Sequence, residues 1–366
     1  MNRATIDFEK EQPQSVILYG FIDKKDDGDL DEFSFLAESA GVLILEAVAQ
    51  RKNPPNPRHY IAPSSVKELS ELVELVKPDL VIFDCELKGS QRNHLEDDLK
   101  IPVLDRTELI LDIFASRAKT KEGKLQVELA QLMYQLPRLA GLWKHFGALG
   151  GGIGTRGPGE TQLEVDRRRV NQKITQLKRQ IKTVQSQRNI QRKSRMQSKA
   201  PKISLVGYTN AGKSTLLNAI TKASAYTDDR LFATLDTLTR KGYFTSSNRE
   251  FLMTDTVGFI RRIPTQLIAA FEATLEEIRF SDLLLIVVDI TDDDHREKLD
   301  VVNSTLDDIG AGDLPKLVVY NKADLLDGSE PIDPAILEFS VSAKRGDGLK
   351  ILLEKLDSMT LRRVSK

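Results

Sequence analysis

Apolar runs alternate with amphipathic stretches over the first 105 residues of the chain. Two stretches, Leu30–Ser39 and Val66–Val76, repeat their apolar residues at the spacing of a helix face. Around them lie short runs rich in Val, Ile and Leu, which are typical of strands buried on both faces of a parallel sheet. The runs predicted as strands are Ser15–Ile22, Val42–Val48, Asp79–Asp84 and Ile101–Leu104. This order predicts a small, mostly parallel α/β domain over residues 1–105.

From Arg106 the apolar spacing becomes helical and stays helical to about residue 200. One long helix is predicted to end near Pro137, and a second is predicted to begin around Glu160. The second helix carries its apolar residues at alternating steps of four and three, the seam of a coiled coil. These seam positions are Val170, Ile174, Leu177, Ile181 and Val184. We therefore expect a long antiparallel helical hairpin over residues 106–200.

Strand-like and helix-like segments alternate again from residue 201 onward. Phe251–Thr254, Leu283–Val288 and Leu317–Tyr320 are short apolar runs, and Lys350–Leu356 begins a final helix. The alternation predicts a doubly wound, mostly parallel sheet in a C-terminal domain over residues 201–366. The chain as a whole is thus assigned to the α/β class, with the hairpin between two α/β domains.

Composition narrows the class of protein without identifying it. The 366 residues are 40% hydrophobic and 29% charged, as in a soluble globular protein of two or three domains. The single cysteine, Cys85, excludes a disulfide framework and a thiolate zinc site and suits a reducing cytosol. No apolar run approaches the ~20 residues that span a membrane, and no signal-peptide core follows Met1. His59 and His94 have no evident partner in sequence, so solvated or structural roles are expected.

The charge is distributed unevenly along the chain. Between Arg167 and Lys202 there are 13 Lys and Arg and no Asp or Glu, so the net charge of −1 leaves −14 elsewhere (−1 − 13). A helical segment whose charged residues are all positive favours an anionic partner. Nucleic acid is the preferred partner; an anionic lipid surface and a face that is only solvated are the alternatives. The predicted RNA-binding residues are Arg156, Arg167, Arg168, Arg169, Lys173, Lys178, Arg179, Lys182, Arg188, Arg192 and Lys193.

Arg156 belongs to a glycine-rich loop between the two predicted long helices. Residues 147–157 contain six glycines, and the loop continues to Glu160. Composition alone fits a flexible linker as well as a binding loop.

The segment from Gly207 to Ser214 fits the pattern G-x-x-x-x-G-K-[ST]. A β-branched strand precedes it and a helical segment follows, so a chance glycine turn is the weaker reading. Loop N–H groups at a helix N-terminus bind phosphate; Lys213 is expected to reach the β- and γ-phosphates, and Ser214 to bind Mg²⁺. The predicted nucleotide-binding residues here are Gly207, Tyr208, Thr209, Asn210, Ala211, Gly212, Lys213, Ser214 and Thr215.

Two further segments are expected near the metal and the γ-phosphate. Asp255-Thr256-Val257-Gly258 ends a predicted strand; its acid can hold the Mg²⁺ shell indirectly, and the Gly258 N–H can meet the γ-phosphate. Thr234 is a candidate for a second Mg²⁺ hydroxyl and for catalysis. The residues around it that are assigned to the nucleotide are Phe232, Ala233, Thr234, Leu235 and Asp236.

The sequence Asn321-Lys322-Ala323-Asp324 follows another predicted strand. The Asp324 carboxylate can accept both N1–H and the N2 amino group of guanine, which adenine cannot offer, although ATP is not excluded. Ser342-Ala343-Lys344 can close over the base. An ordinary strand-end turn is the alternative, and the two preceding motifs argue against it.

These ordered motifs resemble those of translation-factor-type GTPases. The chain is similar to the HflX family of the Obg–HflX group over nearly its whole length. The likeness rests on Asp105–Phe114, Gly154–Glu164 and Phe232–Asp236. The resemblance implies a GTPase that binds the large (50S) ribosomal subunit and splits ribosomes stalled under stress, with the glycine loop and hairpin approaching ribosomal RNA.

The resemblance also shows departures and leaves alternatives. Phe259 stands where Ras-like enzymes place a water-orienting glutamine, so slow intrinsic turnover and stimulation by ribosomes are expected. Asn210 resembles the potassium-dependent members of this class, which implies K⁺ beside Mg²⁺. Some family members continue into a further C-terminal domain.

An RNA-binding switch on non-ribosomal RNA and a membrane-associated GTPase remain alternatives. A cytoplasmic monomer is expected.

Overall fold

The structure is a computed structural model that describes residues 6, 13–22, 28–138, 158–196, 200–221, 231–232, 237–262, 264, 277–326 and 339–364. It falls into two compact units, residues 1–116 with 124–183 and residues 117–123 with 184–366. Among the described residues, no helix is both long enough and apolar enough to cross a membrane.

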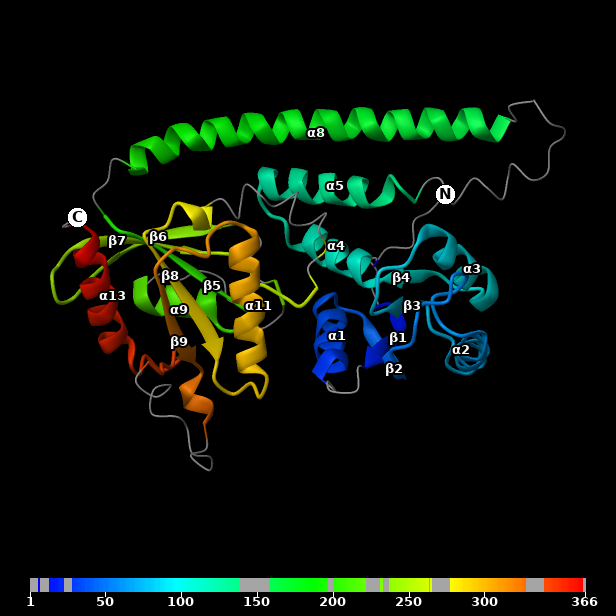
Figure 1. The fold of residues 1–366 in the computed structure, drawn as a ribbon, viewed down its shortest axis with the longest axis horizontal. Coiled ribbons are helices and arrows are strands. Elements are labelled where there is room, and N and C mark those ends of the chain that lie inside the picture. The colour runs from blue at the N-terminus through cyan, green and yellow to red at the C-terminus, as the bar shows by residue number, and fades with distance from the viewer. Residues whose placement is uncertain are drawn as a thin grey trace. The chain divides into compact units, whose positions relative to one another are not determined.

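The first unit contains a four-stranded sheet in the order β2-β1-β3-β4, and all its strands are parallel (Figure 1). The apolar runs predicted as strands form this sheet because both faces of its inner strands are buried. Helices α2 and α3 pack on one face through Val66, Leu69, Leu95 and Leu99. The elements are β1 Ser15–Ile22, α1 Gly28–Ser39, β2 Leu43–Arg51, α2 Pro63–Val76, β3 Leu80–Phe83, α3 Gly89–Leu99 and β4 Val103–Asp105.

Helix α3 was not predicted from the sequence, where β3 and β4 follow each other directly. Its eleven residues include only two apolar ones, Leu95 and Leu99, so the segment shows little helical periodicity. Yet β3 and β4 are parallel, and parallel neighbours need a crossover connection. The crossover explains why a polar segment is helical here.

The single long helix predicted from Arg106 to Pro137 is wrong in its continuity. The structure has α4 Arg106–Arg117 and α5 Lys121–Gln135 instead. The Gly123 N–H donates to the Thr120 hydroxyl at 3.0 Å, which is the N-cap bond of a new helix. Apolar spacing alone does not detect such a break because both helices keep a buried face.

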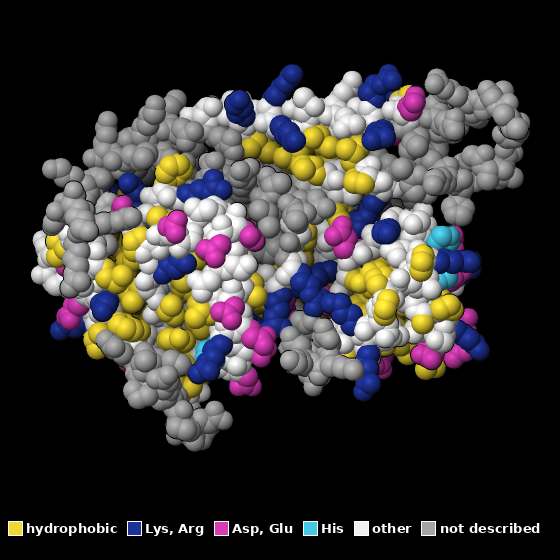
Figure 2. Space-filling view, in the orientation of Figure 1, with side chains coloured by type: hydrophobic (Ala, Val, Ile, Leu, Met, Phe, Trp, Pro, Cys, Tyr) yellow, Lys and Arg dark blue, Asp and Glu magenta, His cyan; other side chains and the backbone are white. Residues whose placement is uncertain are grey.

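The predicted coiled-coil seam is confirmed by α8, Pro158–Met196, which lies beside α5 (Figure 1). Ile174, Leu177 and Ile181 are buried against Leu129 and its apolar neighbours on α5. Figure 2 shows apolar side chains along this seam and Lys and Arg side chains projecting from α8. The apolar face of α8 is therefore occupied by a partner helix of the same chain.

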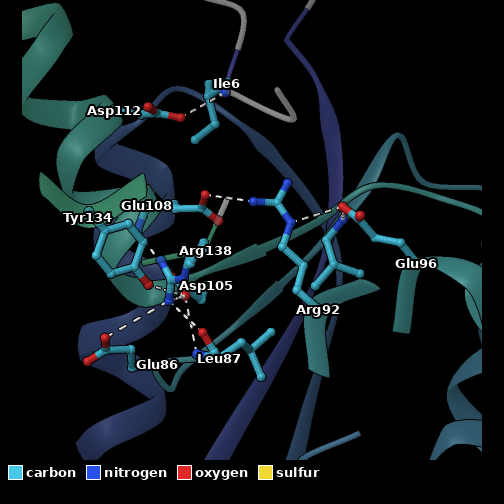
Figure 3. A network of polar contacts seen from close by, with 11 residues as sticks. Ile6, Glu86, Leu87, Arg92, Glu96, Asp105, Glu108, Asp112, Tyr134 and Arg138 are labelled. Atoms are coloured by element: carbon cyan, nitrogen blue, oxygen red, sulfur yellow. Dashed lines mark hydrogen bonds and ion pairs between the residues drawn. The ribbon is translucent and has the colours of Figure 1, made fainter. Parts of the chain in front are cut away.

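A buried polar network ties α5 to the N-terminal sheet (Figure 3). Asp105, at the end of β4, accepts hydrogen bonds from the Glu108 N–H at 2.9 Å, from Arg138 at 2.8 Å and from the Tyr134 hydroxyl. The Arg138 guanidinium also stacks 3.4 Å from the centroid of the Tyr134 ring. Because Tyr134 lies in the last turn of α5 and Arg138 lies in the turn that follows it, the network anchors the hairpin on the N-terminal sheet.

The second unit contains a five-stranded sheet in the order β6-β7-β5-β8-β9, in which only β6 is antiparallel. Alternate residues of β8 face opposite sides: Leu285 packs with α9 and α13, and Leu284 packs with α11. This confirms the doubly wound prediction. The elements are β5 Lys202–Gly207, α9 Lys213–Thr221, β6 Leu238–Tyr243, β7 Glu250–Asp255, β8 Leu283–Asp289, α11 His295–Asp308, β9 Lys316–Asn321, the 3-10 helix η1 Ala323–Leu325 and α13 Leu349–Val364.

Candidate active site

The glycine motif forms the loop between β5 and α9, at the carboxyl end of a central parallel strand. A Cβ on Gly207 would lie 2.3 Å from the Val287 carbonyl oxygen, and one on Gly212 would lie 2.2 Å from Asn321 Nδ2. Gly212 also has a φ of +87°, a left-handed conformation that favours glycine. Both glycines are therefore required for close approach, and the loop opens onto the N-terminus of α9.

Lys213 is buried at the start of α9. Its ammonium donates to the carbonyl oxygens of Gly207 at 3.1 Å and Tyr208 at 2.7 Å. Burial lowers the pKa of Lys213 to about 8, while the Asp255 carboxylate acts in the opposite direction. Burial therefore disfavours the charged form of Lys213 in the free protein. An anionic ligand stabilises that charged form, so the pocket favours the binding of an anion.

We expect nucleotide binding at pH 8.5 to take up a proton. With a pKa of about 8, the Lys213 side chain is mostly neutral at pH 8.5 in the free protein. Phosphate oxygens favour the charged form, so binding restores the proton, and the uptake is about 0.7 per GDP at pH 8.5 and about 0.1 at pH 7. Calorimetric titration of GDP in buffers of different ionisation enthalpy measures this uptake. Equal binding enthalpies in all buffers at pH 8.5 would contradict the assignment.

Ser214 and Asp255 meet where the phosphate loop faces the end of β7. The Ser214 hydroxyl donates to Asp255 Oδ2 at 2.5 Å, and Asp255 is fully buried. A hydroxyl and a carboxylate are hard oxygen donors, and Mg²⁺ is held by one or two such groups together with substrate phosphates. The residues present therefore fit a magnesium ion.

The segment that follows β7 is hydrogen-bonded to the phosphate loop. The Thr209 N–H donates to the Phe259 carbonyl oxygen at 2.8 Å, and the Phe259 N–H donates to the Gly207 carbonyl oxygen at 3.1 Å. A Cβ on Gly258 would lie 2.8 Å from Thr209 Cα and 3.1 Å from Lys213 Nζ. Gly258 thus lies directly against the loop and the lysine, as its expected contact with a terminal phosphate requires.

The side chain of Phe259 points away from this site into the core. It is 2% exposed and packs in a cluster with Val206, Ile278, Leu284 and Ile286. The residue at the position of the Ras-like glutamine is thus a core residue of the sheet and does not face the nucleotide site.

Asn321 connects the segments Asn321–Asp324 and Ser342–Lys344 to the phosphate loop. The sequence did not reveal this connection. The Asn321 amide donates to the Ala211 carbonyl oxygen at 3.0 Å and accepts the Ala343 N–H at 3.0 Å. Lys322 pairs with Asp289, 2.6 Å away. The side chain of Asn321 therefore holds the phosphate loop and the Ser342–Lys344 segment together, with Asp324 beside them.

Asp324 is partly exposed and carries an ionised carboxylate. The Ser342 hydroxyl donates to its Oδ1 at 2.7 Å and lowers the pKa of Asp324. Ser342 itself is buried, and its hydroxyl accepts the Arg345 N–H at 3.0 Å. The carboxylate is thereby oriented and kept as an acceptor at neutral pH.

Other predicted residues are placed as follows. The Thr256 hydroxyl donates to the Leu205 carbonyl oxygen at 2.6 Å, Asn210 has a φ of +62°, and Lys344 is exposed. Phe232 is buried. Ala233, Thr234, Leu235, Asp236 and Arg156 lie outside the described residues, as do the side chains of Arg188, Arg192 and Lys193.

The described basic side chains of α8 are exposed, as the charge pattern suggested. Lys173 lies 3.1 Å from Glu128, and Arg169 lies 3.9 Å from Asp166. The exposed set is Arg167, Arg168, Arg169, Lys173, Lys178, Arg179 and Lys182. His59, by contrast, is buried with its Nε2 2.8 Å from Asp98, which gives it a structural partner.

Comparison with known proteins agrees with this geometry. Three family models match: "GTP-binding GTPase N-terminal" at residues 27–115, "GTP-binding GTPase Middle Region" at 117–195 and "50S ribosome-binding GTPase" at 202–322. GTPase HflX of Caldanaerobacter subterraneus subsp. tengcongensis is 47% identical over 95% of this chain and 81% of its own. GTPase HflX of Escherichia coli is 46% identical over 88% of this chain and 75% of its own.

Among solved structures, a complex of SsGBP with GDP is similar over 95% of this chain and 99% of its own, with 26% identity and a TM-score of 0.51. The fold and the site define a P-loop GTPase, an enzyme that binds guanine nucleotide and hydrolyses GTP. The relatives narrow this class further. The chain belongs to the HflX family of GTPases.

Proposed function

We propose that this GTPase binds the large (50S) ribosomal subunit through the basic face of α8 and splits or rescues stalled ribosomes under stress in the cytoplasm. The observation that carries the proposal is the run of 13 Lys and Arg without an acidic residue between Arg167 and Lys202. The family whose model matches residues 202–322 is described as ribosome-binding, which supports the same partner.

The exposure of α8 supports a phosphate backbone as the contact. Arg168, Lys178, Arg179 and Lys182 are exposed, and positive side chains along one helix attract nucleic acid by releasing its counterions. An amphipathic helix on a lipid surface needs a free apolar face. The apolar face of α8 packs against α5, so RNA is favoured over membrane.

For hydrolysis, we assign the phosphate contacts to Gly207–Thr215 and the base contacts to Asn321–Asp324 and Ser342–Lys344. Mg²⁺, when bound, neutralises charge on the β- and γ-phosphates. Ser214, Thr234 and Asp255 would hold the ion, Asp255 through its shell, while Lys213 and the Gly258 N–H would stabilise charge on the γ-phosphate. Water then attacks this phosphate to give GDP and phosphate.

In this proposal the ribosome contributes to GTP hydrolysis because Phe259 cannot position the attacking water. The buried side chain of Phe259 can neither accept a hydrogen bond from a water nor reach the site, so intrinsic turnover is slow in this proposal. The bound ribosome supplies or orders the group that positions the water.

We also propose domain bounds of 1–105, 106–200 and 201–366. The three matched ranges, 27–115, 117–195 and 202–322, support boundaries close to these. Residues 124–183, which include most of α5 and the part of α8 up to Thr183, share a compact unit with the N-terminal sheet. In this proposal that unit carries the exposed basic side chains of α8 that contact RNA.

The test measures GTP hydrolysis with and without purified 50S subunits. The variant carries Arg168→Gln, Lys178→Gln, Arg179→Gln and Lys182→Gln. We expect 50S subunits to raise turnover many-fold for the unaltered protein and much less for the variant. The slope of log affinity against log salt should fall by about 3 to 4, one for each lost phosphate contact.

A matched control removes the same number and kind of charges from the N-terminal domain: Arg51→Gln, Lys52→Gln, Arg58→Gln and Lys67→Gln, all at exposed positions. It should retain the stimulation. If 50S subunits leave turnover unchanged at low salt, the ribosomal assignment is wrong. Sedimentation with anionic liposomes or with non-ribosomal RNA then identifies the partner of the basic face.

A further inference from the structure

Tyr208, the second residue of the phosphate loop, connects the loop to the segment that follows Gly258. Its ring is buried, and its phenol oxygen accepts the Arg261 N–H at 2.7 Å. Tyr208 and Phe259 also form a parallel bridge, whose two backbone hydrogen bonds join Phe259 to Gly207 and Thr209, two residues before Arg261. Phe259 is therefore bound to the loop by two backbone hydrogen bonds, and Arg261 is bound to it through the Tyr208 side chain.

The N-terminal turn of α11 lies beside the same tyrosine and beside Arg261. The Arg261 guanidinium pairs with Glu297 at 2.8 Å and lies 3.5 Å from Asp294. The ammonium of Lys298 lies 5.3 Å from the centroid of the Tyr208 ring, within the range of a cation–π contact. The tyrosine thus lies where the phosphate loop, the segment after Gly258 and α11 meet.

We infer that the Tyr208 hydroxyl is a positioning group for the GTP-bound state. It does not touch the reacting atoms, and it acts through the backbone of residues 258–261. Gly258 lies against Thr209 and Lys213, where its N–H can meet the γ-phosphate, so the tether determines how well that N–H is aimed. This inference rests on the proposed contact of Gly258 and is independent of the ribosomal partner.

GDP lacks a γ-phosphate, so the inference predicts different effects on the binding of GDP and of a GTP analogue. Loss of the tether should weaken binding of a non-hydrolysable GTP analogue and lower kcat, but it should leave GDP affinity unchanged. A neutral hydrogen bond of this kind corresponds to a change of about 3- to 10-fold. A tyrosine that served only to pack the loop would alter both nucleotides alike.

The test is Tyr208→Phe, which keeps the ring and removes only the hydroxyl. We expect the ratio of GTP-analogue affinity to GDP affinity to fall about 3- to 10-fold, with intrinsic kcat falling to a similar extent. GDP affinity should stay within about two-fold of its original value. All measurements are made without ribosomes, so a failure of the ribosomal assignment does not affect them.

The matched control is Tyr19→Phe in the N-terminal sheet, where the phenol donates to Gln50 Oε1 at 2.5 Å. It removes a comparable hydroxyl from a site with no part in nucleotide binding, and its affinity ratio and kcat should not change. Equal losses of GDP and analogue affinity in Tyr208→Phe would mean that the hydroxyl is purely structural. An unchanged ratio and kcat would overturn the inference as well.

Discussion

Asp324→Asn is expected to weaken GDP and GTP binding by about 10²- to 10⁴-fold. Two hydrogen bonds from guanine to a carboxylate are lost or weakened, and bonds to a charged group contribute about 1.5–3 kcal/mol each. The Ser342 hydroxyl keeps the carboxylate ionised and oriented by lowering the pKa of Asp324. In the variant, the amide NH₂ faces the N–H groups of guanine, and two donors repel each other.

The same change should improve binding of xanthosine diphosphate. Xanthine carries a carbonyl oxygen where guanine carries its amino group, so the asparagine NH₂ gains an acceptor. Titration of both diphosphates against Asp324→Asn measures the exchange of specificity. Asp313→Asn, an exposed aspartate of the same unit, is the control and should bind GDP normally. If Asp324→Asn retained full GDP affinity, Asp324 would not be the base-reading residue.

Asp105→Ala is expected to lower the free energy of unfolding of the first unit by about 3–5 kcal/mol. Removal of one partner of a buried ion pair leaves the other charge desolvated. Burial raises the pKa of Asp105 and lowers that of Arg138, so each charge is held in place by the other. The Tyr134 hydroxyl and the Glu108 N–H would lose their acceptor too (Figure 3).

Urea unfolding followed by circular dichroism measures this loss. Glu71→Ala removes an exposed pair whose atoms are 3.8 Å apart, and it should cost no more than about 0.5 kcal/mol. In the double variant Asp105→Ala/Arg138→Met the loss should be smaller than in Asp105→Ala alone, because no uncompensated charge remains. A loss below about 1 kcal/mol in Asp105→Ala would show that the network contributes little to stability.

Much of the nucleotide site could be predicted because its parts are local in sequence. A glycine loop between a strand and a helix binds phosphate whatever the rest of the chain does. Gly207, Lys213 and Asp255 were therefore assigned correctly to strand ends and a helix start. The seam of α8 was equally visible, since Ile174, Leu177 and Ile181 recur at fixed steps and needed a partner helix.

Other features depended on residues far apart in the chain. Helix α3 exists because β3 and β4 pair in parallel, which its own polar sequence does not reveal. Asn321 was expected at the nucleotide, yet its amide also joins Ala211 to Ala343 across the loops. Phe259 follows a nucleotide-binding motif in sequence, while its side chain belongs to the core.

The sequence by itself determined the class of enzyme, the order of its motifs and the run of Lys and Arg without an acidic residue between Arg167 and Lys202, because each depends on short-range patterns of residue type. The tertiary structure decided which groups meet: Ser214 with Asp255, the Tyr208 hydroxyl with the Arg261 N–H, and Asp105 with Arg138. These contacts join segments separated by 33 to 53 residues in the chain. Only packing of the sheets and helices brings such segments within hydrogen-bonding distance.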